Sequence, residues 1–136
     1  MRIAADYCRF SIPEVDAGIP LAWGGMQRLI ELIGETVTTD LVLTCRPIDA
    51  PEALRIGLVS RILPGDGFEN QVQELAGGIA AKASIVLRIF KQQLQALRDG
   101  SYDARNDAAG LLAARSDDEA SRLGAAYIAS RIGARR

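Results

Sequence analysis

The residues best placed to do chemistry are one carboxylate and the pair of glycines that follows it. Glu14 ends the stretch Phe10-Ser11-Ile12-Pro13-Glu14, and Gly24-Gly25 open a helical pattern that continues with Met26-Gln27-Arg28-Leu29. The backbone before a proline favours an extended conformation, so Glu14 is expected at the end of an extended segment. In apolar surroundings a carboxylate can have its pKa raised toward working pH, which suits it to carrying protons. Backbone N–H groups at a helix start can hold an anionic group or a water molecule, and a tight, closely packed turn is the alternative use of two glycines.

Absent residue types remove several other chemistries. The sequence contains no histidine, so Ser-His-Asp catalysis, Cys-His catalysis and histidine-bearing metal sites are excluded. Cys8 and Cys45 are far apart and too few for a disulfide framework or a zinc cluster, and we expect both to be small buried hydrophobes. Acid–base chemistry therefore has to use carboxylates, Lys, Tyr or backbone amides, and no metal site is predicted.

Composition indicates one ordinary globular chain. Of its 136 residues 49% are hydrophobic and 24% are charged, and the net charge of -1 argues against nucleic acid as a partner. No apolar run approaches the ~20 residues of a membrane span, and neither end carries a recognisable signal peptide or lipidation motif. These features predict a cytoplasmic protein without a membrane partner.

Extended segments and helices alternate in the first half of the chain. Short extended segments are expected at 2–5, 9–12 and 58–63. Helices are expected at 24–34, 37–44 and 49–57. The third helix has the clearest start, because Asp49 can cap it, Pro51 tolerates its first turn and Glu52 completes a capping box.

From Phe68 onward the pattern is helical. One helix starts there, and the next is capped by Ser84 and stops at Asp99-Gly100. Two more are expected at 101–115 and 117–131. One apolar stripe marks the helix that follows Ser84, and it consists of Val86, Phe90, Leu94 and Leu97. These boundaries predict a partial core at 1–66 and a helical region at 67–136.

Three stretches of the first half stand at a recognisable spacing. The first is Arg2-Ile3-Ala4-Ala5-Asp6 … Phe10-Ser11-Ile12-Pro13-Glu14. The second is Gly18-Ile19 … Gly24-Gly25-Met26-Gln27-Arg28-Leu29. The third is Leu41-Val42-Leu43-Thr44 … Ile48-Asp49-Ala50 … Ala53 … Gly57-Leu58-Val59. They resemble D-x-R-I-A … F-x-x-P-E, G … G-G-x-x-R-L and L-T-G-x-x-I-x-A-x-x-A-x-x-x-G-L-V, the signatures of the enoyl-CoA hydratase/isomerase (crotonase) family.

The resemblance implies an α/β fold. It is the C-terminal part of a crotonase-type ββα spiral with few short strands, followed by a mainly helical region that builds trimers in the family. Two family segments are not among these 136 residues. One gives the first oxyanion-hole amide, and the other, G-G-G-x-E, gives the second amide and, in hydratases, a second glutamate. By this likeness Met1 falls just after the second segment, and we expect a truncated chain with half of a site.

The resemblance also assigns roles to residues. Glu14 matches the family's glutamate that moves a proton at the acyl chain or activates water, and an ordinary exposed or ion-paired glutamate is the alternative. Trp23 replaces a commonly small residue, so it narrows an acyl pocket or fills the core. With Gly24 and Gly25 it makes the expected substrate-binding set. Asp16, two residues past Glu14, is expected to be a solvent-facing loop acid.

Other positions depart from the family pattern. Leu21 stands where proline is frequent and Cys45 where glycine is usual, which points away from standard hydratase specificity. The family's C-terminal helix commonly lends an aromatic residue and a lysine to CoA binding. The corresponding region here offers Gly110, Ser130, Tyr127 and Arg131.

The resemblance thus implies a crotonase-type hydratase (a lyase) or isomerase of fatty-acid metabolism, with an acyl-CoA thioester as substrate and no cofactor. Isomerases of the family can work with one glutamate at the place of Glu14. Because losing one oxyanion-hole donor typically costs ~10²–10³ in rate, activity is expected to need a partner, such as a complementing N-terminal half. A homo-oligomer, trimer or hexamer, is expected as well. The alternative is a catalytically inactive oligomerisation module from a truncated crotonase gene.

Overall fold

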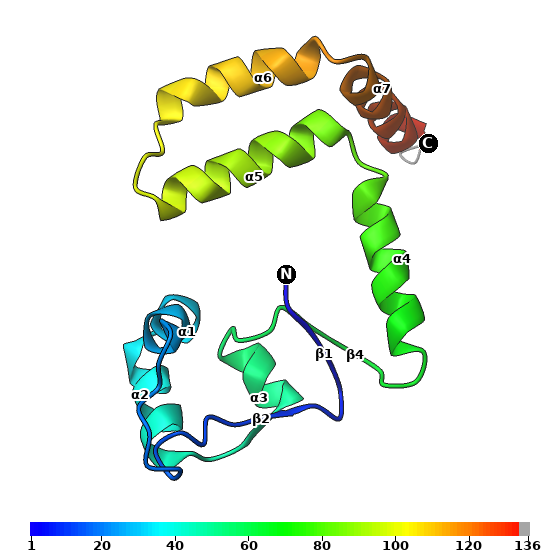
Figure 1. The fold of residues 1–136 in the computed structure, drawn as a ribbon. Helices are drawn as coiled ribbons and strands as arrows, with labels where there is room; N and C mark the ends of the chain where they lie inside the picture. Colours follow the sequence, from blue (N-terminus) through cyan, green and yellow to red (C-terminus); the bar gives the residue numbers. More distant parts are fainter. Residues whose placement is uncertain (134–136) are drawn as a thin grey trace. The chain divides into compact units, whose positions relative to one another are not determined.

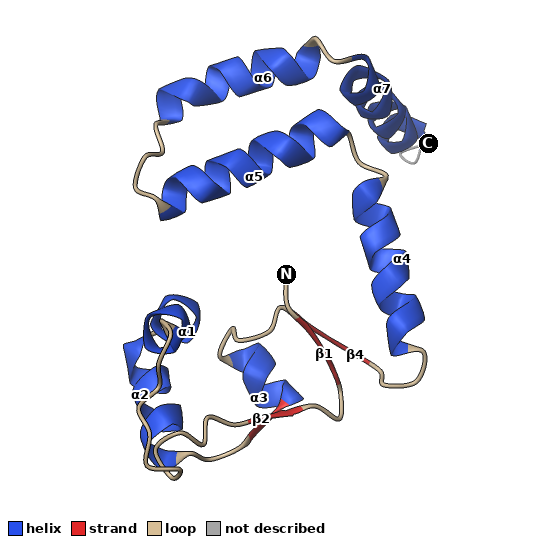
Figure 2. Ribbon diagram, viewed as in Figure 1, coloured by secondary structure: helices blue, strands red, loops and turns tan. Residues whose placement is uncertain are grey.

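Strands occur only in the first half of the described residues, and helices alone follow them (Figure 2). The computed structural model describes residues 1–133. These divide into two units, which are Met1–Val72 (unit 1) and the described residues from Gln73 onward (unit 2). The division falls inside one helix, α4 (Phe68–Ala80).

Two small sheets tie together distant segments of unit 1. β1 (Ile3–Ala5) pairs in parallel with β4 (Arg61–Leu63). β2 (Arg9–Phe10) pairs antiparallel with β3 (Ile48–Asp49), a strand that the sequence pattern does not predict. Arg2 reinforces the first pairing, because its guanidinium donates to the carbonyl oxygens of Leu58 and, at 3.2 Å, Gly57.

Three helices complete unit 1 before α4 begins (Figure 1): α1 (Gly25–Ile33), α2 (Glu35–Thr44) and α3 (Ala50–Arg55). Gly34 ends α1 and starts α2, and its φ of +78° is one that glycine adopts without strain. The core of the unit is made of small and aliphatic residues, namely Ala4, Ile33, Leu41, Ile48, Ala50, Ala53 and Val59. Small side chains let the strands and α3 approach closely, which agrees with the low aromatic content.

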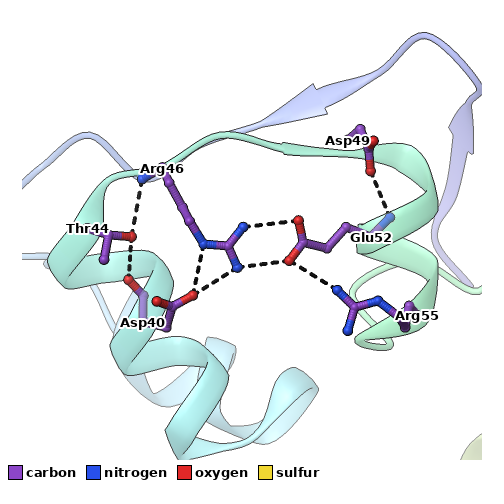
Figure 3. Close-up of polar contacts among 6 residues, drawn as sticks. All are labelled: Asp40, Thr44, Arg46, Asp49, Glu52 and Arg55. Atoms are coloured by element: carbon purple, nitrogen blue, oxygen red, sulfur yellow. Dashed lines mark hydrogen bonds and ion pairs between the residues drawn. The ribbon is translucent and has the colours of Figure 1, made fainter.

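One arginine joins α2 to α3 through two carboxylates (Figure 3). Arg46 donates to Asp40 Oδ2 from Nε at 2.9 Å, and to both oxygens of Glu52 at 2.8 and 3.0 Å. These hydrogen bonds, the one to Glu52 first, raise the pKa of Arg46 above its ordinary value. The hydrogen bond from Arg46 in turn holds the pKa of Glu52 below its ordinary value, although desolvation opposes this. The two helices are therefore fixed at a charged corner.

The predicted N-cap of α3, Asp49, is confirmed. The second hydrogen bond of a capping box, from the Asp49 N–H back to the Glu52 side chain, is not formed, so that part of the prediction is wrong. Asp49 Oδ1 accepts from the Glu52 N–H at 2.9 Å. The Glu52 carboxylate turns to Arg46 instead of returning to the Asp49 N–H, because a charged, bidentate partner lies within reach (Figure 3).

In the part that is described, unit 2 contains the rest of α4, α5 (Ser84–Arg98), a short 3₁₀ turn η1 (Ala104–Asn106), α6 (Asp107–Arg115) and α7 (Asp118–Gly133). α5 and α6 lie side by side (Figure 1), and a side chain at Gly110 would come within 3.3 Å of Ile89. The stripe predicted on α5 is exposed, for example 60% at Phe90. None of the described helices combines the length and the apolar character that a membrane crossing requires.

Two helix starts in unit 2 differ from the expectation, and that of α7 agrees with it to within one residue. Ser84 is the first residue of α5 and not its cap, and its N–H donates to Glu119 Oε2 of α7 at 2.9 Å. The helix expected from residue 101 begins at Asp107, because Asp103 Oδ1 accepts from the Arg105 N–H at 2.9 Å and so caps the separate turn η1. α7 is capped by Asp117, which accepts from the Ala120 N–H at 2.8 Å.

Candidate functional site

Glu14 lies on a single helical turn that follows β2. The Ile19 N–H donates to the Glu14 carbonyl at 2.9 Å, and the Gly18 N–H donates to the Val15 carbonyl at 3.0 Å. Gly18 has a left-handed φ of +72°. These two bonds around a left-handed glycine make a Schellman motif, which closes the turn. The backbone of Glu14 is therefore fixed by local hydrogen bonds before its side chain is considered.

The Glu14 carboxylate is only partly satisfied. The residue is half-buried, and its Oε2 atom is buried with no hydrogen-bond partner among the described residues. Burying a polar atom without a partner is unfavourable, so such an atom in a folded protein requires an explanation. The alternative of an ion-paired Glu14 finds no partner in residues 1–133. Asp16 is exposed, as expected for a loop acid.

Trp23 and Gly24 form a tight turn immediately before α1. The Gly25 N–H donates to the Ala22 carbonyl at 3.0 Å, and the two central residues have φ of +51° (Trp23) and +76° (Gly24). Positive φ at both central positions is the property of a type I′ turn, which favours Gly, Asn and Asp. A bulky residue there is strained. Trp23 is also 102% exposed, so the alternative that it fills the core is wrong.

The unpaired N–H groups at the start of α1 belong to Met26 and Gln27, whereas the sequence predicts them at Gly24 and Gly25. The Gly25 N–H is engaged in the turn, and a side chain at Gly25 would come within 3.0 Å of Leu21 Cγ. Gly25 therefore serves close packing. No side chain caps α1, and no acceptor for the N–H groups of Met26 and Gln27 is found in the described part of the chain. The unpaired N–H groups of Met26 and Gln27 could have been predicted from the general rule that the first N–H groups of an α-helix have no partner within the helix.

The predicted site residues thus occupy two consecutive turns. Glu14 lies on the first, and Trp23, Gly24 and Gly25 make up the second, with no hydrogen bond between the two turns in residues 1–133. The exposed residue Ile19 follows the first turn. The arrangement offers one carboxylate, a short row of free N–H groups and exposed apolar surface.

A small cavity of about 180 Å³ borders the segment that leads to Glu14. Its lining is mainly apolar and consists of Phe10, Ser11, Ile12, Leu29, Leu41, Arg46, Ile48 and Leu58. The guanidinium of Arg46 is already paired with Asp40 and Glu52. The cavity therefore offers space for hydrocarbon but no available charge.

Other candidate groups contribute less to a site. Tyr127 and Arg131 of α7 pair with each other, with the guanidinium 5.3 Å from the ring centroid. Cys45 is buried, as predicted, whereas Cys8 is half-buried. Within residues 1–133 no three Cys, Asp or Glu side chains gather in a way that could hold a metal ion.

Comparison with known proteins gives a consistent likeness. The sequence profile of the enoyl-CoA hydratase/isomerase family matches residues 1–124. The short-chain-enoyl-CoA hydratase of Clostridium acetobutylicum is 38% identical over 94 residues, which are 69% of this chain and 36% of that protein. The crotonyl-CoA hydratase of Syntrophomonas wolfei is 35% identical over 122 residues, 87% of this chain and 47% of that protein. The chain thus spans less than half the length of these two relatives.

The fold shows the same likeness. A crystal structure of an enoyl-CoA hydratase/isomerase family protein from Hyphomonas neptunium matches with a TM-score of 0.78. The match covers 96% of this chain and 50% of that one, at 24% identity, and it supports the fold alone.

Proposed function

Because the chain belongs to the enoyl-CoA hydratase/isomerase family, we propose that it takes part in proton transfer at an acyl-CoA thioester, with Glu14 as the proton carrier. The observation that supports this most directly is the buried, unpartnered Oε2 of Glu14. Because this oxygen accepts no hydrogen bond from the described residues, its capacity to accept a proton is not taken up by them. Its half-buried setting and the fixed backbone turn would hold it in one place.

Two reactions fit a single carboxylate. In an isomerisation, Glu14 would remove a proton from a carbon beside the thioester carbonyl and return it two carbons further on, so that the double bond moves. In a hydration, it would take a proton from water as the oxygen adds to the double bond, and would then deliver that proton to the carbon next to the carbonyl. Isomerisation needs only one acid–base group, and it is the variant that one glutamate serves better.

The substrate contacts in this proposal are Trp23, Gly24 and Gly25, with the free N–H groups of Met26 and Gln27 beside them. Helix-head N–H groups favour a water molecule or a negatively charged group. They are not the amides that the family uses to hold the thioester oxyanion.

We further propose that those oxyanion-hole amides come from additional polypeptide, either attached to this chain or separate from it. The chain's match to less than half of its curated relatives supports this. We propose in addition that the chain forms a homo-oligomer, either a trimer or a hexamer. We also propose that it is cytoplasmic and that its reaction uses no cofactor.

The test is an assay of the purified chain with a four-carbon enoyl-CoA, alone and mixed with a polypeptide that carries the family's G-G-G-x-E segment. We expect turnover in the mixture, and a loss of about 10²–10⁴-fold in Glu14→Gln, the usual contribution of a general acid–base group. Asp16→Asn, two residues away and exposed, is the matched control and should keep full activity. Absence of turnover in both settings, or turnover that ignores Glu14→Gln, would sink the catalytic proposal.

The alternative is a catalytically inactive oligomerisation module. One observation favours it, which is the number of large exposed apolar side chains on α5, α6 and α7: Phe90, Leu97, Leu111, Leu112, Ile128 and Ile132. Sedimentation measurements on the purified chain would then show a stable oligomer without any accompanying turnover. A monomer at micromolar concentration would contradict this alternative.

A further inference from the structure

The residues that follow Glu14 include the longest stretch of the chain without a charge. From Ala17 to Gln27 eleven consecutive residues contain no Asp, Glu, Lys or Arg. This stretch, the uncharged run, is exposed at every residue except Leu21 and Gly25, which are half-buried. Charged residues are depleted, and aromatic residues are enriched, at the centre of protein–protein interfaces. An exposed segment without charge therefore has the composition of an interface and not that of an ordinary surface loop.

Two large apolar side chains of the uncharged run lie in water. Ile19 is 55% exposed, and Trp23 is fully exposed on a backbone with a φ of +51°. Bulky residues avoid this conformation, whereas glycine or asparagine adopts it readily. Strain of this kind persists where a function requires the residue, and tryptophan is among the residues that most often dominate the binding energy of interfaces. The indole therefore fits a contact with another molecule.

The uncharged run lies beside Glu14. It begins three residues after Glu14, at most about 11 Å along the backbone, and the Ile19 N–H donates to the Glu14 carbonyl at 2.9 Å. Amides that hold an oxyanion must lie about 3 Å from it, and the acid–base group must reach a proton of the same acyl group. The polypeptide that supplies those amides therefore has to cover the surface next to Glu14.

We propose that the uncharged run is the surface on which this additional polypeptide docks, and that Trp23 is the anchor of the contact. This inference rests on the proposed function, which calls for such a polypeptide. The complementary surface of the polypeptide is then apolar and uncharged, with a recess for the indole. Trp23 also belongs to the substrate contacts of the proposed function, and a joint between two polypeptides beside Glu14 is where both contacts meet.

Two other occupants match the uncharged run less well. An anionic membrane would be attracted by Lys or Arg beside the apolar side chains, and the run has none. The cation that follows the run, Arg28, already donates to Glu31 at 3.2 Å. A second copy of the chain would bring no oxyanion-hole amides, because the segments that carry them are not among its 136 residues.

The test uses Trp23, the only tryptophan of the chain, as its own reporter. A polypeptide that carries the family's G-G-G-x-E segment, made without tryptophan, is titrated into the full chain while emission and acrylamide quenching are followed. We expect the emission to shift to the blue and the quenching to fall as the polypeptide binds. Calorimetry in parallel gives the affinity.

Two variants test the anchor and the lack of charge separately. Trp23→Gly keeps the positive φ without strain, and Ile19→Asp places a charge in the uncharged run. Each should weaken binding of the polypeptide at least tenfold. Leu43→Ala removes an exposed apolar side chain of α2 and is the matched control, which should bind like the wild type.

Binding without an emission change, or with unaltered affinity in both Trp23→Gly and Ile19→Asp, would overturn this inference and leave the proposed function standing. A blue shift with phosphatidylcholine vesicles alone, or one that follows the concentration of the chain alone, would do the same, because lipid or a second copy would then cover the run. Binding with the expected shift but without turnover would support the docking surface and overturn the catalytic proposal. No binding would overturn the docking surface, and no turnover besides would overturn both.

Discussion

Two side-chain atoms are buried without a partner in residues 1–133, and they call for different explanations. Glu14 Oε2 belongs to a group that can exchange a proton, on a turn at the surface of unit 1. Thr38 Oγ1 belongs to a residue that is 0% exposed in α2, where no substrate can reach it. A hydroxyl has no acid–base use at neutral pH. The unpaired hydroxyl of Thr38 therefore lowers the stability of the fold and has no role in a site.

Thr38→Val should stabilise the chain by about 1 kcal/mol, because it removes an unsatisfied buried hydroxyl and keeps the β-branched shape. The midpoint of urea unfolding, with the slope unchanged, measures the effect. Thr39→Val, one residue on and exposed, is the control and should change the midpoint little. A lower midpoint for Thr38→Val would mean that the hydroxyl has a partner after all.

At the scale of the elements, α5 depends on a cap from another helix. The N-cap residue Ala83 has no side chain that can accept a hydrogen bond, and Glu119 of α7 supplies the acceptor for the Ser84 N–H. Losing a cap typically costs about 0.5–2 kcal/mol. We expect Glu119→Ala to lower the free energy of unfolding by about 1 kcal/mol, as measured by denaturant titration.

Glu119→Gln tests whether the loss of stability comes from the missing cap or from any substitution at this position. Its amide oxygen can still accept from the Ser84 N–H, so the loss should be clearly smaller than in Glu119→Ala. Equal losses in the two variants would argue that the hydrogen bond to α5 contributes nothing.

The charged corner of α2 and α3 makes a prediction about pH. The pKa of Glu52 in the folded chain lies below its ordinary value of 4.5, chiefly because Arg46 donates to it. A lowered pKa stabilises the folded state above the ordinary value, and this contribution is lost as the pH falls through the folded value. The stability difference between wild type and Glu52→Gln should therefore be constant above about pH 5 and shrink below pH 4.5.

Thermal unfolding of both proteins between pH 7 and pH 3 measures this difference. Glu69→Gln in α4, at an exposed position, is the control for removing one carboxylate. A difference that is the same at pH 6 and pH 3 would show that the bond to Arg46 does not couple to folding.

The sequence predicts most helices but not all of their starts. α1, α3 and α4 begin within a residue or two of the expected places, because glycine, proline and capping residues act locally. The start of α5 is different, because its cap comes from Glu119, which is 35 residues away. The sequence does not predict β3 for the same reason, since a two-residue strand is defined only by its pairing with β2.

The candidate site, like the helix starts, can be predicted from the sequence only in part. Glu14 and the glycine pair follow from short motifs in the sequence. The strained backbone of Trp23 and its full exposure do not, because the pattern around a single tryptophan is equally compatible with packing in the core. The Gly25 N–H was expected to be free, and only the folded turn shows that Ala22 accepts its hydrogen bond.

At the scale of the whole molecule, α4 is the helix within which the division between the two units falls. It contains Gly77 and Gly78, and a side chain added at either would find nothing within 4 Å. Glycine within a helix is less favourable than alanine by about 0.5–1 kcal/mol. Gly77→Ala and Gly78→Ala should therefore each stabilise the chain by about that amount.

Thermal unfolding measures this gain, and Gly65→Ala is the contrasting variant. A side chain at Gly65 would collide with the ring of Tyr7, so this substitution should destabilise. If Gly77→Ala and Gly78→Ala both lowered the melting temperature, the two positions would have to contact another molecule, because no described atom lies within 4 Å of a side chain added there.

The parallel pairing of β1 with β4 bears on how the chain is made. Ile3 pairs with Arg61, so β1 leaves the ribosome 58 residues (61 minus 3) before its partner strand does. At usual rates of synthesis the wait is roughly 3–12 s. During that time the Ile3–Ala5 segment is an unpaired, apolar strand, open to whatever chaperone or neighbouring chain meets it first. The oldest part of unit 1 is thus among the last to be fixed in place.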